Sequence, residues 1–84
     1  MQTTKVLGID PGLDRTGWAI IEGNANNLKI VECGLLSTPK EDTLAQRIEG
    51  IYTGISQIIN RHNPDDIAME ELFFVRLQTT VYHT

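Results

Sequence analysis

The fold of this chain is constrained most by an apolar run at residues 6–9, which ends in one acid, Asp10, and a turn at Pro11 and Gly12. A strand without polar alternation is typical of a position inside a sheet, so we expect this run to form a buried strand. A carboxylate at the end of such a strand is costly unless a positive charge or hydrogen-bond donors meet it. Asp10 is therefore the first candidate for a functional residue.

The rest of the chain predicts three more strands and one helix. Strands are expected at residues 5–10, 16–22, 28–36 and 66–74. The turn at 11–15 and the hairpin loop at 23–27 contain the Gly, Pro and Asn residues that turns favour. The residues that follow the third strand include an apolar stripe at helical spacing, made of Leu44, Ile48, Ile51, Ile55 and Ile58. Thr43 supplies a capping side chain at its start, and Pro64 ends the helix by Asn63.

These elements define an α/β fold with a mixed sheet. Two hairpins join the first three strands into an antiparallel meander, and the helix crosses over to a fourth strand that is parallel to the first. A right-handed crossover places the fourth strand beside the first, which gives the sheet order 3-2-1-4. Asp10 and the acids of the fourth strand, Glu70 and Glu71, then lie at the same edge of the sheet, where ligand sites collect.

Two neighbouring carboxylates either share a proton or bind a cation, and their hard oxygens favour magnesium or manganese. The alternative for Asp10 is that it caps the turn, and for Asp14 we prefer a turn-forming role. Glu70 and Glu71 are consecutive and face opposite sides of a strand, so spacing does not say which of them joins Asp10.

Composition limits the other classes of function. The chain has 84 residues, 40% of them apolar, which suits one small domain. The formal net charge of −4 argues against strong non-specific nucleic-acid binding by this chain alone. A single cysteine, Cys33, excludes an internal disulfide. Neither a hydrophobic run of membrane-spanning length nor a signal peptide is present, so a cytoplasmic location away from the membrane is expected.

Two motifs resemble those of the RuvC family of Holliday-junction endonucleases. The first is Gly8-Ile9-Asp10-Pro11-Gly12, followed by Thr16-Gly17, and the second runs from Ile67 to Phe74 with Glu70 at its centre. The first motif alone also resembles the start of sugar kinases and actin-like ATPases. The second motif at this distance makes the pair more specific.

The resemblance implies an RNase H-like fold and divalent-metal-dependent hydrolysis of phosphodiesters in Holliday junctions. It implies that Asp10 and Glu70 are catalytic residues and metal ligands for Mg²⁺, with Mn²⁺ as a substitute, and that Phe73 and Arg76 contact DNA. The partners implied are four-way junction DNA, a second copy in a homodimer, and branch-migration helicases.

The chain also departs from the family. Members are much longer, and no acid follows Glu71 to complete the ligand set. We therefore expect residues 1–84 to be the N-terminal part of one nuclease domain, with an irregular tail at 75–84 and at best feeble activity alone. One face of the sheet lacks a covering helix, and the fourth strand is an unpaired edge, so we expect self-association. Two alternatives stay open, namely an actin-like or sugar-kinase-type ATP-binding fragment and a non-catalytic binding module.

Overall fold

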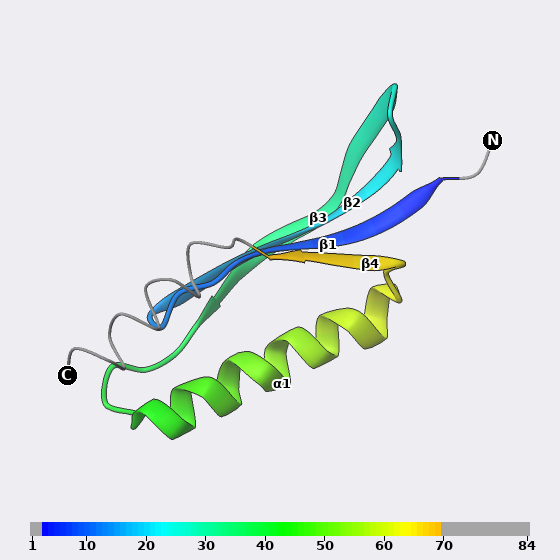
Figure 1. Cartoon of the computed structure of the whole chain (residues 1–84). Helices are drawn as coiled ribbons and strands as arrows, with labels where there is room; N and C mark the ends of the chain where they lie inside the picture. Colours follow the sequence, from blue (N-terminus) through cyan, green and yellow to red (C-terminus); the bar gives the residue numbers. More distant parts are fainter. Residues whose placement is uncertain (1–2, 70–84) are drawn as a thin grey trace, which may run out of the picture.

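The protein is described by a computed structural model in which residues 3–69 are placed. Its elements are β1 (Thr4–Asp10), β2 (Arg15–Asn24), β3 (Asn27–Ser37), α1 (Leu44–His62) and β4 (Asp66–Met69). The sheet order is β3-β2-β1-β4, and α1 lies along one face of the sheet (Figure 1). The order predicted from handedness is confirmed, and so are the meander and the crossover helix.

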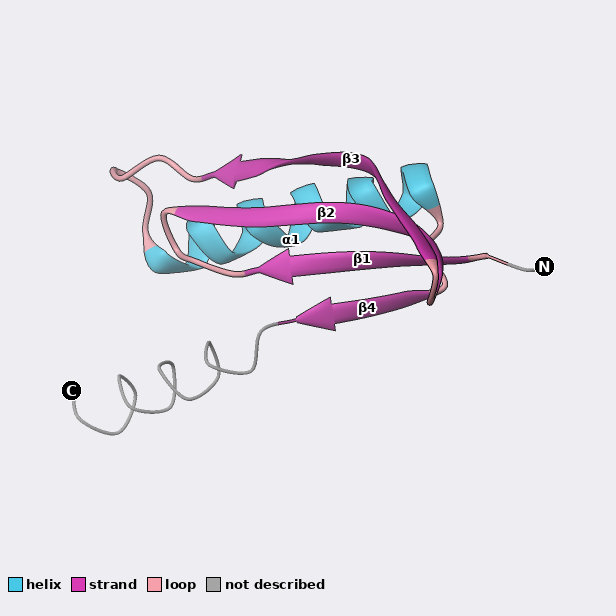
Figure 2. Cartoon of the chain, turned by 90° about the horizontal axis from the view of Figure 1, so that it is seen from above, coloured by secondary structure: helices cyan, strands magenta, loops and turns pink. Residues whose placement is uncertain are grey.

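The strand register fixes which residues meet at the edge where β1 ends. β1 and β2 are antiparallel, with Asp10 opposite Gly17, whereas β1 and β4 are parallel, with Ile9 opposite Met69. The arrows of β1 and β4 therefore point to the same edge of the sheet (Figure 2). This is the edge at which the sequence places its candidate acids.

The helix and the sheet share one core. It consists of Leu7, Ile9, Ile20 and Ile58, with Trp18, Leu36, Ile55 and Ile59 packed against it. Side chains alternate along the strands, so the face toward α1, here called the helix face, carries Leu7, Ile9, Thr16, Trp18, Ile20 and Leu36. The opposite face, here called the open face, carries Gly8, Asp10, Gly17, Ala19, Cys33, Leu35 and Ala68.

The expectation that the first strand is buried throughout is only half right. Leu7 and Ile9 are buried beneath α1, but Val6 and Gly8 on the other face are half-buried. The reason is that one helix can cover only one face of a sheet. No described helix covers the open face, so the apolar run in β1 has a solvent side among residues 3–69.

The helix begins and ends where its local signals predict. Thr43 accepts a hydrogen bond from the Gln46 amide, and the Gln46 side chain accepts one from the Thr43 amide, which forms a capping box. The helix ends at Asn63 in the left-handed conformation, immediately before Pro64. Its apolar stripe covers the sheet unevenly, because Ile58 is 3% exposed whereas Leu44 and Ile48 are more than half exposed.

Two glycines make room for close packing on the helix face. A Cβ on Gly54 would lie 2.8 Å from the Leu36 side chain, so the absence of a side chain lets α1 approach β3. A Cβ on Gly34 would lie 3.1 Å from the Trp18 indole, which lies across that glycine. The β2–β3 register shifts between Ile20 and Ile21, away from Gly34, which instead allows the close approach of Trp18.

Ionic contacts fasten the carboxyl end of α1 to the sheet. The Glu32 carboxylate of β3 accepts a hydrogen bond from Arg61 at 2.7 Å and lies 2.7 Å from the His62 ring. The contact with His62, supported by the charge of Arg61, lowers the pKa of Glu32 below its usual value. The Lys5 ammonium also donates to the His62 carbonyl.

In the part of the chain that the structure describes, no helix is both long and apolar enough to cross a membrane.

Candidate functional site

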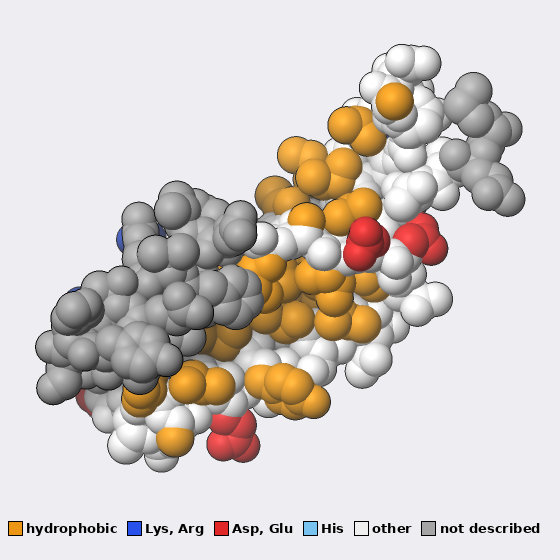
Figure 3. Space-filling view, viewed as in Figure 1, with side chains coloured by type: hydrophobic (Ala, Val, Ile, Leu, Met, Phe, Trp, Pro, Cys, Tyr) orange, Lys and Arg blue, Asp and Glu red, His pale blue; other side chains and the backbone are white. Residues whose placement is uncertain are grey.

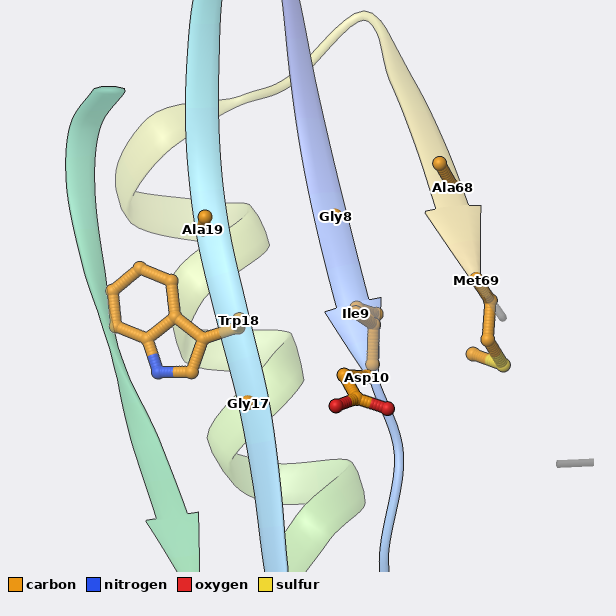
Figure 4. Close-up of a pocket in the computed structure, with 8 residues that line it drawn as sticks. All are labelled: Gly8, Ile9, Asp10, Gly17, Trp18, Ala19, Ala68 and Met69. Carbon is orange, nitrogen blue, oxygen red and sulfur yellow. The ribbon is translucent and has the colours of Figure 1, made fainter.

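Asp10 is the last residue of β1, and its side chain is exposed on the open face. It stands at one end of a shallow hollow formed by the neighbouring strands (Figure 4). The residues around this hollow are Gly8, Ile9, Asp10, Gly17, Trp18, Ala19, Ala68 and Met69. Figure 4 shows the Asp10 carboxylate at the tip of the β1 arrow, between Gly17 of β2 and Met69 of β4.

The hollow exists because small residues meet on three adjacent strands. Gly8 pairs with Ala19 on one side and with Ala68 on the other, and Gly17 pairs with Asp10. A Cβ on Gly17 would lie in van der Waals contact with the Asp10 side chain, 3.7 Å from its Cβ, so the glycine leaves that side of the acid uncovered. The small side chains thus leave the Asp10 carboxylate open to a ligand that approaches from the open face.

The charge of Asp10 is not neutralised by the described part of the chain. None of the ion pairs among residues 3–69 includes Asp10. No group of three acidic, histidine or cysteine side chains able to hold a metal occurs within these residues either. A single carboxylate binds magnesium weakly, since this ion requires a rigid set of oxygen ligands. Any metal site at Asp10 therefore needs ligands beyond residues 3–69.

The other predicted site residues fall where the structure gives no description. Glu70, Glu71, Phe73 and Arg76 all follow Met69, the last described residue, and so does the tail predicted at 75–84. The roles assigned to them from the sequence stay predictions. What the structure does describe is the strand that leads to Glu70, since β4 runs beside β1 up to the pair Ile9 and Met69.

Asp14 has a partner that sequence patterns did not reveal. Its carboxylate pairs at 3.0 Å with Arg47 of α1, which is consistent with the turn-forming role. The signal for this pair was faint. Arg47 lies three residues after Leu44, beside the apolar stripe, and an arginine in that position could equally lie in solvent.

An apolar groove separates the beginning of α1 from the turn after Asp10. It is lined by Ile9, Pro11, Gly12, Leu13, Thr16, Ile48, Ile51, Ile55 and Met69. Its lining explains why Ile48, although part of the helix stripe, is 55% exposed. Sequence periodicity predicted the stripe but not that its first half would face an open groove.

The mixed sheet with a crossover helix, and an acid at the end of the first strand, define an RNase H-like fold. Solved structures of RuvC proteins share it. The RuvC of T. thermophilus in complex with a Holliday junction substrate superposes with a TM-score of 0.75, at 23% identity over 81% of this chain and 42% of that chain. A second Thermus thermophilus RuvC structure gives a TM-score of 0.70, at 23% identity over 83% of this chain and 43% of that chain.

The sequence assigns the family. The model of the family described as crossover junction endodeoxyribonuclease RuvC matches residues 6–84, and the chain belongs to this family. The RuvC of Azorhizobium caulinodans is 39% identical over 69 residues, or 82% of this chain and 41% of that protein. The RuvC of Halothermothrix orenii is 41% identical over 69 residues, or 82% of this chain and 42% of that protein. The chain thus spans about two fifths of the length of these relatives.

Proposed function

We propose that the chain is the N-terminal part of a structure-selective endonuclease that resolves Holliday junctions by divalent-metal-dependent hydrolysis of phosphodiesters. The observation that carries the proposal is the parallel register of β1 and β4. Ile9 is opposite Met69, and the next residue along each strand direction is an acid, Asp10 in one case and Glu70 in the other. We infer that Asp10 and Glu70 continue this register and meet at the strand ends, as successive residues of parallel strands do.

Asp10 and Glu70 are the residues of this chain that would hold the metal, as catalytic residues and ligands of Mg²⁺ or, in its place, Mn²⁺. Carboxylate oxygens are the ligands that these ions prefer. When bound, such ions supply positive charge that stabilises the attacking and leaving oxygens of a phosphodiester displacement. The chain contributes the fixed strand ends and the hollow of small residues beside Asp10, which leaves space for a backbone phosphate.

The remaining parts of the proposal concern DNA and partners. In this proposal Phe73 stacks on a base at the junction, and Arg76 lies near a phosphate. The whole protein acts in the cytoplasm as a homodimer, and its partners are branch-migration helicases. Support comes from family membership and from the Thermus relative, whose structure holds a Holliday junction substrate. Stacking of one base on an aromatic ring is worth about 1–3 kcal/mol, so Phe73 is the residue we expect to matter most for DNA affinity.

We also propose that residues 1–84 form part of a single nuclease domain and are at best feebly active alone. Two carboxylates make an incomplete magnesium site, and the chain spans only 41% of the length of a curated relative. The kinase-type alternative loses its support, because the family model matches nearly the whole chain.

A thermal-melting experiment tests the proposal. Mn²⁺ that binds only the folded chain raises its melting temperature by mass action. We expect a rise for the wild-type chain that is lost in Asp10→Asn and in Glu70→Gln. Glu22→Gln, which removes an acid paired with Lys5 far from Asp10, is the matched control and should keep the rise. A rise that survives in both Asp10→Asn and Glu70→Gln would refute the metal site, and stabilisation by ATP would revive the kinase alternative.

A further inference from the structure

The turn that follows Asp10 is held by three side chains from other parts of the fold, here called the turn network: Thr16, Thr38 and Arg47. The hydroxyl of Thr16, which is fully buried, donates to the Gly12 carbonyl at 3.0 Å and accepts from the Gly12 amide at 3.4 Å. The turn is thereby attached to β2 at the position next to Gly17, the residue opposite Asp10.

The other two members attach the turn to the segment that leads into α1. The Thr38 hydroxyl donates to the Leu13 carbonyl at 2.6 Å, and the Thr38 amide donates to the Asp14 carbonyl at 3.3 Å. Arg47 pairs with the Asp14 carboxylate at 3.0 Å through Nη1 and donates from Nε to the Pro39 carbonyl at 3.2 Å. Each residue from Gly12 to Asp14 is therefore held by a contact from outside the turn.

Arg47 is the charged member of the network, and its ion pair contributes little to stability. Its side chain is only 15% exposed, although the partner carboxylate of Asp14 is 69% exposed. An ion pair with so accessible a partner adds little to the free energy of folding. Its geometry has a different consequence, because one guanidinium joins the turn after Asp10, the segment before α1 and the first turns of the helix.

We propose that Arg47 is a positioning residue for Asp10, acting through Asp14 to fix the turn that immediately follows the acid. The proposal rests on the proposed function, in which Asp10 is a metal ligand. Residues outside the ligand set that orient a ligand commonly change metal affinity by 10- to 100-fold when they are removed. Since Arg47 acts through the turn and not on the carboxylate itself, we expect an effect of about tenfold, at the lower end of that range.

When Arg47 is removed, its charge and its positioning role predict opposite changes in cation affinity, which makes the proposal testable. Arg47 is positive, so its removal should strengthen cation binding if only charge matters, and Asp14 is negative, so its removal should weaken it. If positioning dominates, both removals weaken binding, because either one breaks the same contact. The sign of the Arg47 effect therefore separates the two explanations.

The experiment uses the full 84-residue chain and follows the broadening of the Gly17 amide NMR signal as Mn²⁺ is added. For Arg47→Gln and for Asp14→Asn, we expect about tenfold more Mn²⁺ to be needed for half-maximal broadening. The matched control is Arg61→Gln, which removes an arginine of the same helix whose ion pair with Glu32 lies at the other end of α1. This control should shift the requirement less than twofold, and a lowered requirement in Arg47→Gln would overturn the proposal in favour of charge alone.

A second readout does not depend on metal. Hydrogen exchange of the Thr38 amide, which donates to the Asp14 carbonyl, should accelerate in Arg47→Gln and stay unchanged in Arg61→Gln. Unchanged exchange in Arg47→Gln would refute the role of Arg47 in the turn and leave the proposed function intact. Gly17 broadening that persists in Asp10→Asn would instead refute the metal site at Asp10, and with it the proposal that Arg47 serves that site.

Discussion

The two faces of the sheet have opposite characters. On the helix face, Leu7 and Ile20 are completely buried beneath α1, and the polar Thr16 is buried with a hydrogen-bond partner. On the open face, Leu35 is 62% exposed, and small residues surround Asp10. Both faces belong to the same strands, so within residues 3–69 the difference comes from α1, which covers one face, and not from the strand sequences alone.

The comparison separates stability from chemistry. The helix face holds the buried apolar area that stabilises the fold, whereas the open face carries an exposed acid that contributes little to folding and is available to a ligand. Figure 3 shows apolar side chains gathered on the side of the molecule where β4 and α1 lie. Ile67 and Met69 of β4 are each more than 40% exposed. Surface of this kind is typical of a face that another chain or another segment covers.

The largest expected effect contrasts one leucine on each face. Leu7→Ala removes a fully buried side chain, and a cavity of this kind costs about 2–5 kcal/mol of unfolding free energy. Leu35→Ala makes the same change on the open face, where the cost should stay within about 0.5 kcal/mol. Urea unfolding of the two variants, at a protein concentration low enough for the chain to be monomeric, measures both values. Equal losses would show that the open face is covered in solution and would break the comparison.

The apolar side chains exposed on the open face, such as Leu35, predict self-association of the 84-residue chain at about tens of micromolar. Leu35→Lys places a charge on the open face and should weaken association about tenfold, since exclusion of one leucine from water is worth roughly 1.5–3 kcal/mol. Sedimentation equilibrium of the two chains measures the difference. A wild-type chain that stays a compact monomer in this concentration range would contradict the prediction.

Two glycines of α1 give a smaller contrast in unfolding free energy. Gly50→Ala should raise the unfolding free energy by up to about 1 kcal/mol through helix propensity, because its new Cβ would lie 3.6 Å from Thr38, an ordinary contact. Gly54→Ala should show no such gain, since its Cβ would lie 2.8 Å from the packed Leu36 side chain. Thermal unfolding of the pair measures the difference, and an equal gain at both positions would mean that α1 does not approach β3 so closely.

The smallest effect concerns pH. The pKa of Glu32 is lowered from 4.5 in the folded chain, chiefly by the hydrogen bond with His62 and further by Arg61. Glu32 therefore stabilises the fold above pH 4.5, and this contribution is lost as the pH falls through its lower folded-state pKa. Urea unfolding can be measured between about pH 6 and pH 3, the range in which a carboxylate titrates. The unfolding free energy should fall more steeply with decreasing pH for the wild type than for Glu32→Gln. Parallel curves would exclude a contribution from this pair.

The sequence predicted the parts of the fold that depend on local pattern and handedness. The Thr43 cap, the end before Pro64 and the order β3-β2-β1-β4 follow from capping, proline geometry and crossover handedness, and each is confirmed. Burial of β1 was overestimated, because an apolar run does not reveal whether one or two layers cover a sheet. The Arg47–Asp14 pair was missed, because it joins positions 33 apart in a way that no local period encodes.

Of the predicted metal ligands, the structure describes only Asp10, and its role as a ligand stays a prediction. The family motifs name Asp10 and Glu70, and the register brings the strand before Glu70 alongside β1 as expected. The hollow around Asp10 was not foreseen, since it depends on Gly8, Gly17 and Ala68 coming together from three strands. Small residues in separate strands carry no signal of their meeting until the register is known.

The central claim is that Asp10 binds a divalent ion at the edge where β1 and β4 end, and an NMR map of bound Mn²⁺ tests it most directly. We predict that the amides of Gly8 and Gly17 broaden first and that this broadening disappears in Asp10→Asn. Broadening centred instead on Asp65 and Asp66, the acids at the opposite end of β4, would contradict the claim.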